Sequence, residues 1–218
     1  MNKPTSLLLL FGLFILLMVY IQIGVFSIAF SKLGISEHGI SLLLFSSLLG
    51  STVNLPLFKI KADPDVEPEQ VLPQRILFGQ KLPFTGKTIV AINVGGAIIP
   101  LLFSIYLLLL TPVNLFQSIL AIGIVASVSF TLSRPIKGLG IGMPILVAPL
   151  TAVLSAWVIA PEHSAALAYI SGTLGVLTGA DLFRLKDIRR LAAPVASIGG
   201  AGTFDGIFIT GIVAVLLA

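Results

Sequence analysis

The feature that most constrains this chain is a series of apolar stretches, each close to the roughly 20 residues that an α-helix needs to cross a bilayer's hydrocarbon. The composition agrees with this pattern, because 56% of the 218 residues are hydrophobic and only 10% are charged. A soluble domain carries about 25% charged residues. The sequence therefore predicts an integral membrane protein.

Hydropathy predicts an all-α fold, a polytopic transmembrane helix bundle of about seven spans that forms a single domain over residues 1–218. The first apolar stretch is longer than the apolar region of a signal peptide, so we expect a retained span. The one long polar stretch, residues 59–87, is rich in proline and charge and is expected to be a surface loop with room for a short hairpin. The predicted spans lie near residues 5–30, 37–58, 88–110, 114–133, 139–160, 163–183 and 195–218.

Basic residues concentrate in three of the predicted loops, at 59–87, 134–137 and 184–190, and the alternate loops hold only Lys32. The positive-inside rule then predicts an N-terminus in the cytoplasm, a C-terminus outside and a long cytoplasmic loop at 59–87. The net charge of +4 follows from this topology and does not indicate nucleic-acid binding. With no cysteine, two histidines and nine acidic residues, the chain predicts no thiol chemistry, no metal site and no cofactor.

Small and polar residues recur at helical spacing in the second and third predicted spans, and this spacing places each set on one helical face. The polarity gathers toward the predicted cytoplasmic side and indicates a water-accessible cavity there. Alternatively, the small residues simply allow close helix packing and hydrogen bonds between helices. The two sets are Ser47, Gly50, Ser51 and Asn54, and Asn93, Gly96, Ala97 and Pro100.

Two aspartates, Asp181 and Asp205, lie in the last two predicted spans. An aspartate at the centre of a spanning helix costs about 2.5–3.5 kcal/mol by insertion scales, and such residues usually face the bundle interior. If the two share a site, repulsion and burial keep one carboxyl protonated while the other is ionised. That arrangement suits an aspartic hydrolase, in which the carboxylate takes a proton from water and the acid protonates a carbonyl.

Several residues around the aspartates and the two asparagines are predicted to line this site. The glycines before Asp205 weaken the helix and bare backbone groups, or else they only permit close packing. The carboxyl groups meet only if the sixth helix continues past Arg184 or the seventh begins late, near Ser197. Alternatively, Asp181 pairs with Arg184 and is structural. The predicted lining residues are Ala180, Gly199, Gly200, Gly202, Thr203, Phe204, Gly206, Asn54 and Asn93.

Four segments, "LLGSTVNLPL", "AINVGGAIIPLLFSIYLL", "TGADLFRL" and "GGAGTFDGIF", resemble the prokaryotic membrane family catalogued as domain of unknown function 1614. That family brings no established activity. More distantly, the aspartates resemble those of the GxGD intramembrane aspartyl proteases, which include presenilin, signal peptide peptidase and prepilin-type peptidases. This resemblance implies that Asp181 and Asp205 form a catalytic pair on the sixth and seventh helices, facing the cytoplasmic half.

The chain departs from the GxGD pattern at both aspartates. Ala180 stands where presenilin-like members have tyrosine, and Phe204 replaces the second glycine, while Gly202 keeps the first. The Pro-Ala-Leu motif that those enzymes carry on a later helix has no counterpart.

These observations leave three hypotheses. The first is an intramembrane aspartyl protease, or a degenerate relative, that needs no cofactor and whose partners are membrane lipid and a transmembrane peptide substrate. The second is a proton- or ion-coupled small transporter that uses the same buried aspartates. The third is a non-catalytic membrane scaffold. All three predict a multi-pass protein of a prokaryotic-style inner membrane.

Overall fold

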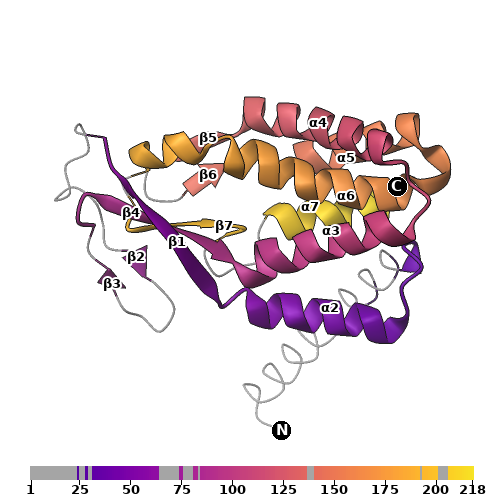
Figure 1. The fold of residues 1–218 in the computed structure, drawn as a ribbon, viewed down its shortest axis with the longest axis horizontal. Helices are drawn as coiled ribbons and strands as arrows, with labels where there is room; N and C mark the ends of the chain where they lie inside the picture. The colour runs from indigo at the N-terminus through magenta and orange to yellow at the C-terminus, as the bar shows by residue number, and fades with distance from the viewer. Residues whose placement is uncertain are drawn as a thin grey trace, which may run out of the picture.

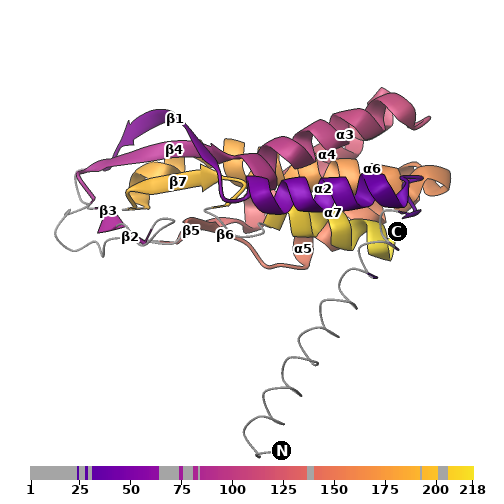
Figure 2. The same ribbon diagram turned by 90° about the horizontal axis from the view of Figure 1, so that it is seen from below.

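The computed structural model of the chain describes residues 24, 28, 31–63, 74–75, 81–82, 84–136, 140–191, 193–200 and 206–218. These residues form an elongated bundle of helices with β-strands gathered at one end (Figure 1). The view from below agrees, with strands β1, β4 and β7 in line with the bundle and beyond its end (Figure 2).

The main helices are α2 (Glu37–Gly50), α3 (Ile99–Leu110), α4 (Leu115–Leu132), α5 (Val147–Ile159), α6 (Ser164–Val176) and α7 (Gly206–Leu217). Shorter helical segments are the π-helices η3 (Val94–Ile98) and η5 (Leu177–Leu182) and the 3₁₀ turns η4 (Pro161–His163) and η6 (Leu185–Arg190). The strands are β1 (Asn54–Lys61), β2 (Gln74–Arg75), β3 (Lys81–Leu82), β4 (Lys87–Asn93), β5 (Arg134–Ile136), β6 (Gly140–Gly142) and β7 (Val195–Ile198).

The predicted all-α bundle of seven spans is wrong, because the described residues include a three-stranded sheet with the order β1-β4-β7. Strand β1 pairs antiparallel with β4, from Asn54 opposite Asn93 to Lys61 opposite Lys87. Strand β7 pairs parallel with β4, from Val195 opposite Ile89 to Ile198 opposite Ile92. Two short antiparallel pairs, β2 with β3 and β5 with β6, complete the strands, and the first is the hairpin for which loop 59–87 had room.

The strands replace one end of four predicted spans. The helices within the predicted spans 37–58, 88–110, 139–160 and 195–218 are shorter, since strand residues occupy 54–58, 88–93, 140–142 and 195–198. Strand β4, with the sequence KTIVAIN, shows why hydropathy failed: it is buried between two neighbouring strands and rich in β-branched residues. A short apolar run of this kind cannot be distinguished from a helix by its apolar content alone.

Two helices in the described part of the chain are long and apolar enough to cross a membrane, Leu115–Leu132 and Pro161–Leu182. They match the predicted spans 114–133 and 163–183. The predicted span 5–30 lies outside the described residues except for Gly24 and Ile28. The orientation inferred from seven alternating spans loses its basis together with those spans.

The basic loops nevertheless lie together at the sheet end of the molecule. The backbone N–H of Asp63, which follows β1, donates to the Arg189 carbonyl of η6 at 3.1 Å. Arg190 also forms an ion pair with Asp63, with 3.5 Å between Nε and Oδ2. The side chain of Arg184 bonds the Ser133 carbonyl, just before β5, at 2.9 Å. Segments far apart in the sequence therefore share one positively charged end.

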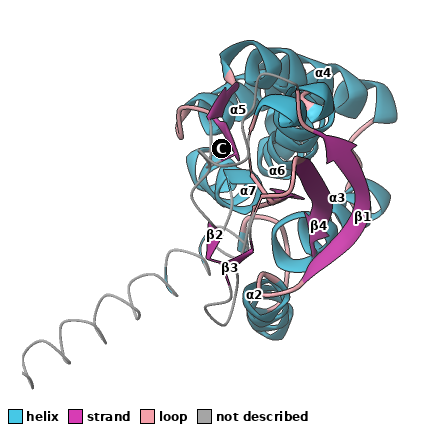
Figure 3. Cartoon of the chain, turned by 90° about the vertical axis from the view of Figure 1, so that its left-hand side faces the viewer, coloured by secondary structure: helices cyan, strands magenta, loops and turns pink. Residues whose placement is uncertain are grey.

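Helix α6 is the centre of the bundle, and the end-on view shows the other helices arranged around it (Figure 3). Leu167, Ala168, Tyr169 and Ile170, which together make about one full turn of α6, are completely buried, so this turn is covered on all sides. Small residues allow its neighbours to approach: a Cβ on Gly175 would lie 2.5 Å from that of Val125 in α4. The core of the protein therefore lies along α6, and the outer faces of α3, α4 and α5 carry exposed leucine, isoleucine and phenylalanine side chains.

Candidate functional site

A polar cluster, formed by the buried Asn93 and the half-buried Asn54 and Ser197, ties the three strands of the sheet together at the ends nearest the helices. The Asn93 side chain, fully buried, donates from Nδ2 to the Ser51 carbonyl at 2.7 Å and to Asn54 Oδ1 at 3.1 Å. Its Oδ1 accepts from the Gly96 N–H at 2.7 Å, and Ser197 Oγ donates to Asn54 Oδ1 at 2.5 Å. The two asparagines predicted to share a site therefore do meet, at strand ends, and they bond each other and the backbone.

The small residues of the second and third predicted spans also meet. Ser47 Oγ donates to the Gly95 carbonyl at 2.6 Å, and a side chain on Gly95 would overlap the Ser47 carbonyl. On the other side, a side chain on Gly96 would overlap the Gly199 carbonyl. This contact is between backbones and leaves no space for another side chain, so these residues act as the packing device that the sequence offered as an alternative.

Gly199 and Gly200 end strand β7 with positive φ angles of 80° and 89°. Residues with a Cβ rarely adopt that conformation, which explains why two glycines stand here. The Gly200 N–H donates to the Ser197 carbonyl at 3.2 Å, which closes a turn directly after β7. The predicted site residues Gly202, Thr203, Phe204 and Asp205 lie outside the described residues, and Gly206 is the first residue of α7.

Asp181 lies in η5, the π-helical turn that continues α6 toward the sheet end. It is half-buried, and the two residues before it, Gly179 and Ala180, are buried. A side chain on Gly179 would overlap the backbone carbonyl of Ala126 in α4, so this turn packs directly on α4. Single π-helical turns are rare in proteins, and those that occur are often found at functional sites.

The antiparallel contact between α6 and α7 relates the Asp181 turn to the start of α7. A Cβ on Gly172 would lie 3.2 Å from the Thr210 methyl group, and one on Gly211 would lie 2.8 Å from the Thr173 hydroxyl. Both helices rise by the same distance per residue, so a step toward the start of α7 is matched by a step toward the end of α6. Counted in this way from the two contacts, Gly206 is about level with Leu177, the first residue of η5. The seventh helix therefore begins later than Ser197, about level with the first residue of the turn that carries Asp181.

Arg184, which the sequence offered as the partner of Asp181, forms an ion pair with Asp187, with 2.9 Å between Nη1 and Oδ2. It also bonds two backbone carbonyls at the end of α4. Neither this anchoring role nor the contact of Ser197 with Asn54 was predicted. No local pattern indicates them, because each joins segments more than 50 residues apart in the chain.

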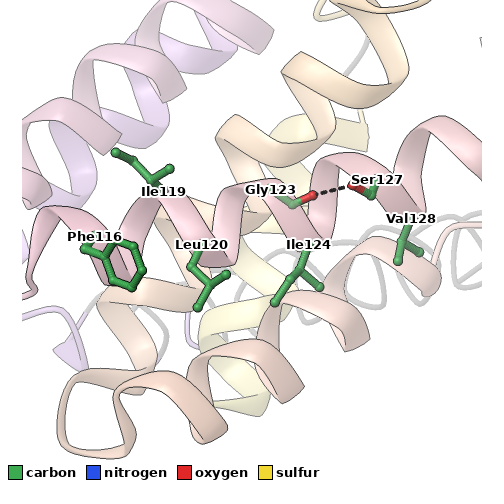
Figure 4. Close-up of a pocket in the computed structure, with 7 residues that line it drawn as sticks. All are labelled: Phe116, Ile119, Leu120, Gly123, Ile124, Ser127 and Val128. Atoms are coloured by element: carbon green, nitrogen blue, oxygen red, sulfur yellow. Dashed lines mark hydrogen bonds between the residues drawn. The ribbon is translucent and has the colours of Figure 1, made fainter.

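A shallow groove of about 560 Å³ runs along the outer face of α4 (Figure 4). Every residue that lines it comes from that one helix, and none is titratable. The hydroxyl of Ser127 is bonded to the Gly123 carbonyl at 2.7 Å. The groove therefore has no group for acid–base chemistry. The described residues also contain no cluster of three or more His, Cys, Asp or Glu side chains that could hold a metal ion.

Comparison with known proteins identifies one family. A family model described as "Protein of unknown function (DUF1614)" matches residues 48–217, from the end of α2 to the end of α7. This match confirms the resemblance drawn from the four segments, and it bears neither on a prokaryotic origin nor on the GxGD proteases. Searches of curated proteins and of solved structures gave no significant match.

Proposed function

The chain belongs to the family of unknown function DUF1614, and since that description supplies no activity, we propose a function from the residues themselves. The protein is a membrane-embedded aspartic hydrolase that cleaves a peptide bond in a membrane-embedded segment of its substrate. Asp181 and Asp205 are the two acid–base groups.

One observation carries this proposal: where α6 and α7 pack antiparallel, Gly206, the first residue of α7, is about level with Leu177, the first residue of the π-helical turn that bears Asp181. Gly206 directly follows Asp205 in the sequence. Aspartic hydrolysis needs two carboxyl groups near each other, and we assign these roles to Asp181 and Asp205. No histidine competes for the role of base, because His38 and His163 lie at the N-terminal ends of α2 and α6, at the opposite end of the bundle from Asp181.

The proposed reaction uses one shared proton. The ionised carboxyl takes a proton from water while the water oxygen attacks the carbonyl carbon, and the protonated carboxyl gives its proton to the carbonyl oxygen. The resulting gem-diol collapses when one of its hydroxyl protons returns to a carboxylate and the other carboxyl protonates the leaving amine. The C–N bond breaks, and the pair ends with the single proton with which it began.

The proposal also places the protein in a cell membrane, the inner membrane of a prokaryotic-style cell, as a multi-pass protein. Beyond the two helices of sufficient length, the outer faces of three helices support this location. Leu109 of α3, Phe116 of α4 and Val158 of α5 are 79%, 72% and 84% exposed. Soluble monomers rarely expose apolar patches of this extent, whereas lipid solvates them without cost.

Cleavage by the reconstituted protein tests the proposal. The protein is incorporated into lipid vesicles with a panel of single-span model peptides, and fragments are identified by mass spectrometry. We expect Asp181→Asn and Asp205→Asn each to lower the cleavage rate by roughly 100-fold or more, because an amide cannot exchange the required proton. Asp63→Asn, which removes a carboxyl group at the same end of the molecule, is the matched control and should cleave normally.

Cleavage that survives in both Asp→Asn variants would overturn the protease proposal. Uptake of a solute that follows the pH gradient and is lost in Asp205→Asn would instead favour the transporter hypothesis. Loss of stability in both variants without any turnover in the unmodified protein would favour the scaffold.

A further inference from the structure

We propose that Arg184 is a positioning residue, whose guanidinium group fastens the π-helical turn that carries Asp181 to the C-terminal end of α4. This inference rests on the proposed function, in which Asp181 is one of the two acid–base groups. Arg184 itself has no part in proton transfer.

The guanidinium group makes four hydrogen bonds, and three of them reach the end of α4. Nη2 donates to the carbonyls of Phe130 at 2.6 Å and Ser133 at 2.9 Å, and Nε donates to Ser133 Oγ at 3.3 Å. The last carbonyls of a helix have no partner within the helix, and the negative end of its dipole attracts a cation. Arg184 satisfies both needs. Its fourth bond, from Nη1 to Asp187, orients the guanidinium group from the other side.

Phe130 of α4 is held by aromatic contacts as well. The Arg184 guanidinium carbon lies 4.3 Å from the centre of the Phe130 ring, a cation–π contact. The neighbouring Phe183 ring meets the same ring edge to face, with 6.1 Å between the centroids. Phe183 and Arg184, the two residues that follow η5, therefore both contact Phe130 of α4.

The other side of the Asp181 turn is fixed by glycine. Gly179 has no side chain to separate it from the Ala126 carbonyl, so the two backbones touch. Asp181 therefore lies between two points of attachment to the same helix, Gly179 two residues before it and Arg184 three residues after it.

This arrangement has a consequence for the direction of the carboxyl group. A π-helical turn holds one residue more than an α-helical turn, and removing that residue from the turn rotates everything beyond it by about 100°. The i−5 hydrogen bond from the Phe183 N–H to the Thr178 carbonyl, at 2.9 Å, closes the wide turn. Because Arg184 holds the segment immediately after this bond, it keeps the wide turn from relaxing to an α-helical one.

A merely stabilising arginine would behave differently. Its loss would lower the melting temperature, but the fraction of protein that stays folded would keep its turn and its turnover number. A positioning arginine changes the local geometry and kcat in protein that is still folded, while KM changes little because Arg184 does not contact substrate.

Distance measurement between spin labels tests the anchoring role without any need for catalysis. The chain has no cysteine, so labels can be placed at Ser127→Cys on the exposed face of α4 and Leu182→Cys on the exposed side of η5. In Arg184→Gln we expect the distance distribution to broaden or shift. In Arg184→Lys we expect a smaller change in the same direction, because lysine retains the charge near the helix end. Lys186→Gln, an exposed charge removed two residues away, is the matched control and should leave the distribution unchanged.

The peptide-cleavage assay then links the geometry to the reaction. We expect Arg184→Gln to lower kcat roughly tenfold or more with KM within about twofold, and Arg184→Lys to recover part of that loss. A native distance distribution in Arg184→Gln would overturn the inference, as would a disturbed distribution with native kcat. If the unmodified protein cleaved no peptide, the proposed function would fail, and the label distances alone would still decide whether Arg184 anchors the turn.

Discussion

Helix α4 and the continuous helix Pro161–Leu182, which contains α6, are both long and apolar enough to cross a membrane, but their surroundings are opposite. In an apolar 18-residue stretch of each helix, 28% is buried in α4 and 72% in the helix that contains α6. The difference follows from which residues the two helices carry on their faces. Helix α4 presents Phe116, Ile119 and Leu120 outward, whereas α6 carries Gly172 and Gly175 where its neighbours approach. Apolar length predicts a helix, and small residues predict which helix becomes the centre.

The largest expected effect concerns one glycine in α4 and one in η5, the π-helical turn that continues α6. Gly179→Leu would force a side chain into the Ala126 backbone and should destabilise the fold by about 4 kcal/mol or more. Gly123→Leu on the outer face of α4 meets nothing within 4 Å and should be neutral or slightly stabilising. Thermal unfolding of both variants in detergent compares them. Equal melting temperatures would contradict the central position of α6.

A smaller effect is expected from truncating a large apolar side chain in each helix. Leu167→Ala in α6 removes a completely buried side chain and should cost about 2–5 kcal/mol. Phe116→Ala in α4 removes a ring that is 72% exposed, and should cost less than about 1 kcal/mol. Chemical denaturation of the two variants measures both values. If Phe116→Ala proved the more destabilising, the outer face of α4 would be an interface and not a lipid-facing surface.

The smallest effect concerns how the two helices begin. Asn114 caps α4, accepting from the Phe116 N–H at 2.9 Å while Gln117 bonds back to the Asn114 N–H at 3.1 Å. Its replacement by alanine should cost about 1 kcal/mol. His163 stands at the same position before α6 and makes no capping bond, so His163→Ala should change the melting temperature little. A larger loss in His163→Ala than in Asn114→Ala would show that α6 depends on its terminus more than on its packing.

The candidate site was only partly accessible from the sequence. Helical spacing placed Ser47 and Gly50 on one face of their helix and offered close packing as its role, but only the structure shows that this face contacts the glycines near Asn93. The prediction that both asparagines lie in spanning helices was wrong, since Asn54 begins a strand and Asn93 ends one. The anchoring of Asp181 through Arg184 could not be predicted, because the α4 carbonyls that it binds lie in another part of the chain.

By itself the sequence determined the two long apolar helices and the family, since length and motif are properties of single segments. Only the tertiary structure decided that residues 54–61, 87–93 and 195–198 are strands. An apolar, β-branched segment can form either a short helix or a strand, and the choice depends on hydrogen-bond partners. For β4 one of those partners is β7, which lies about a hundred residues further along the chain, so no local pattern in β4 can specify the pairing.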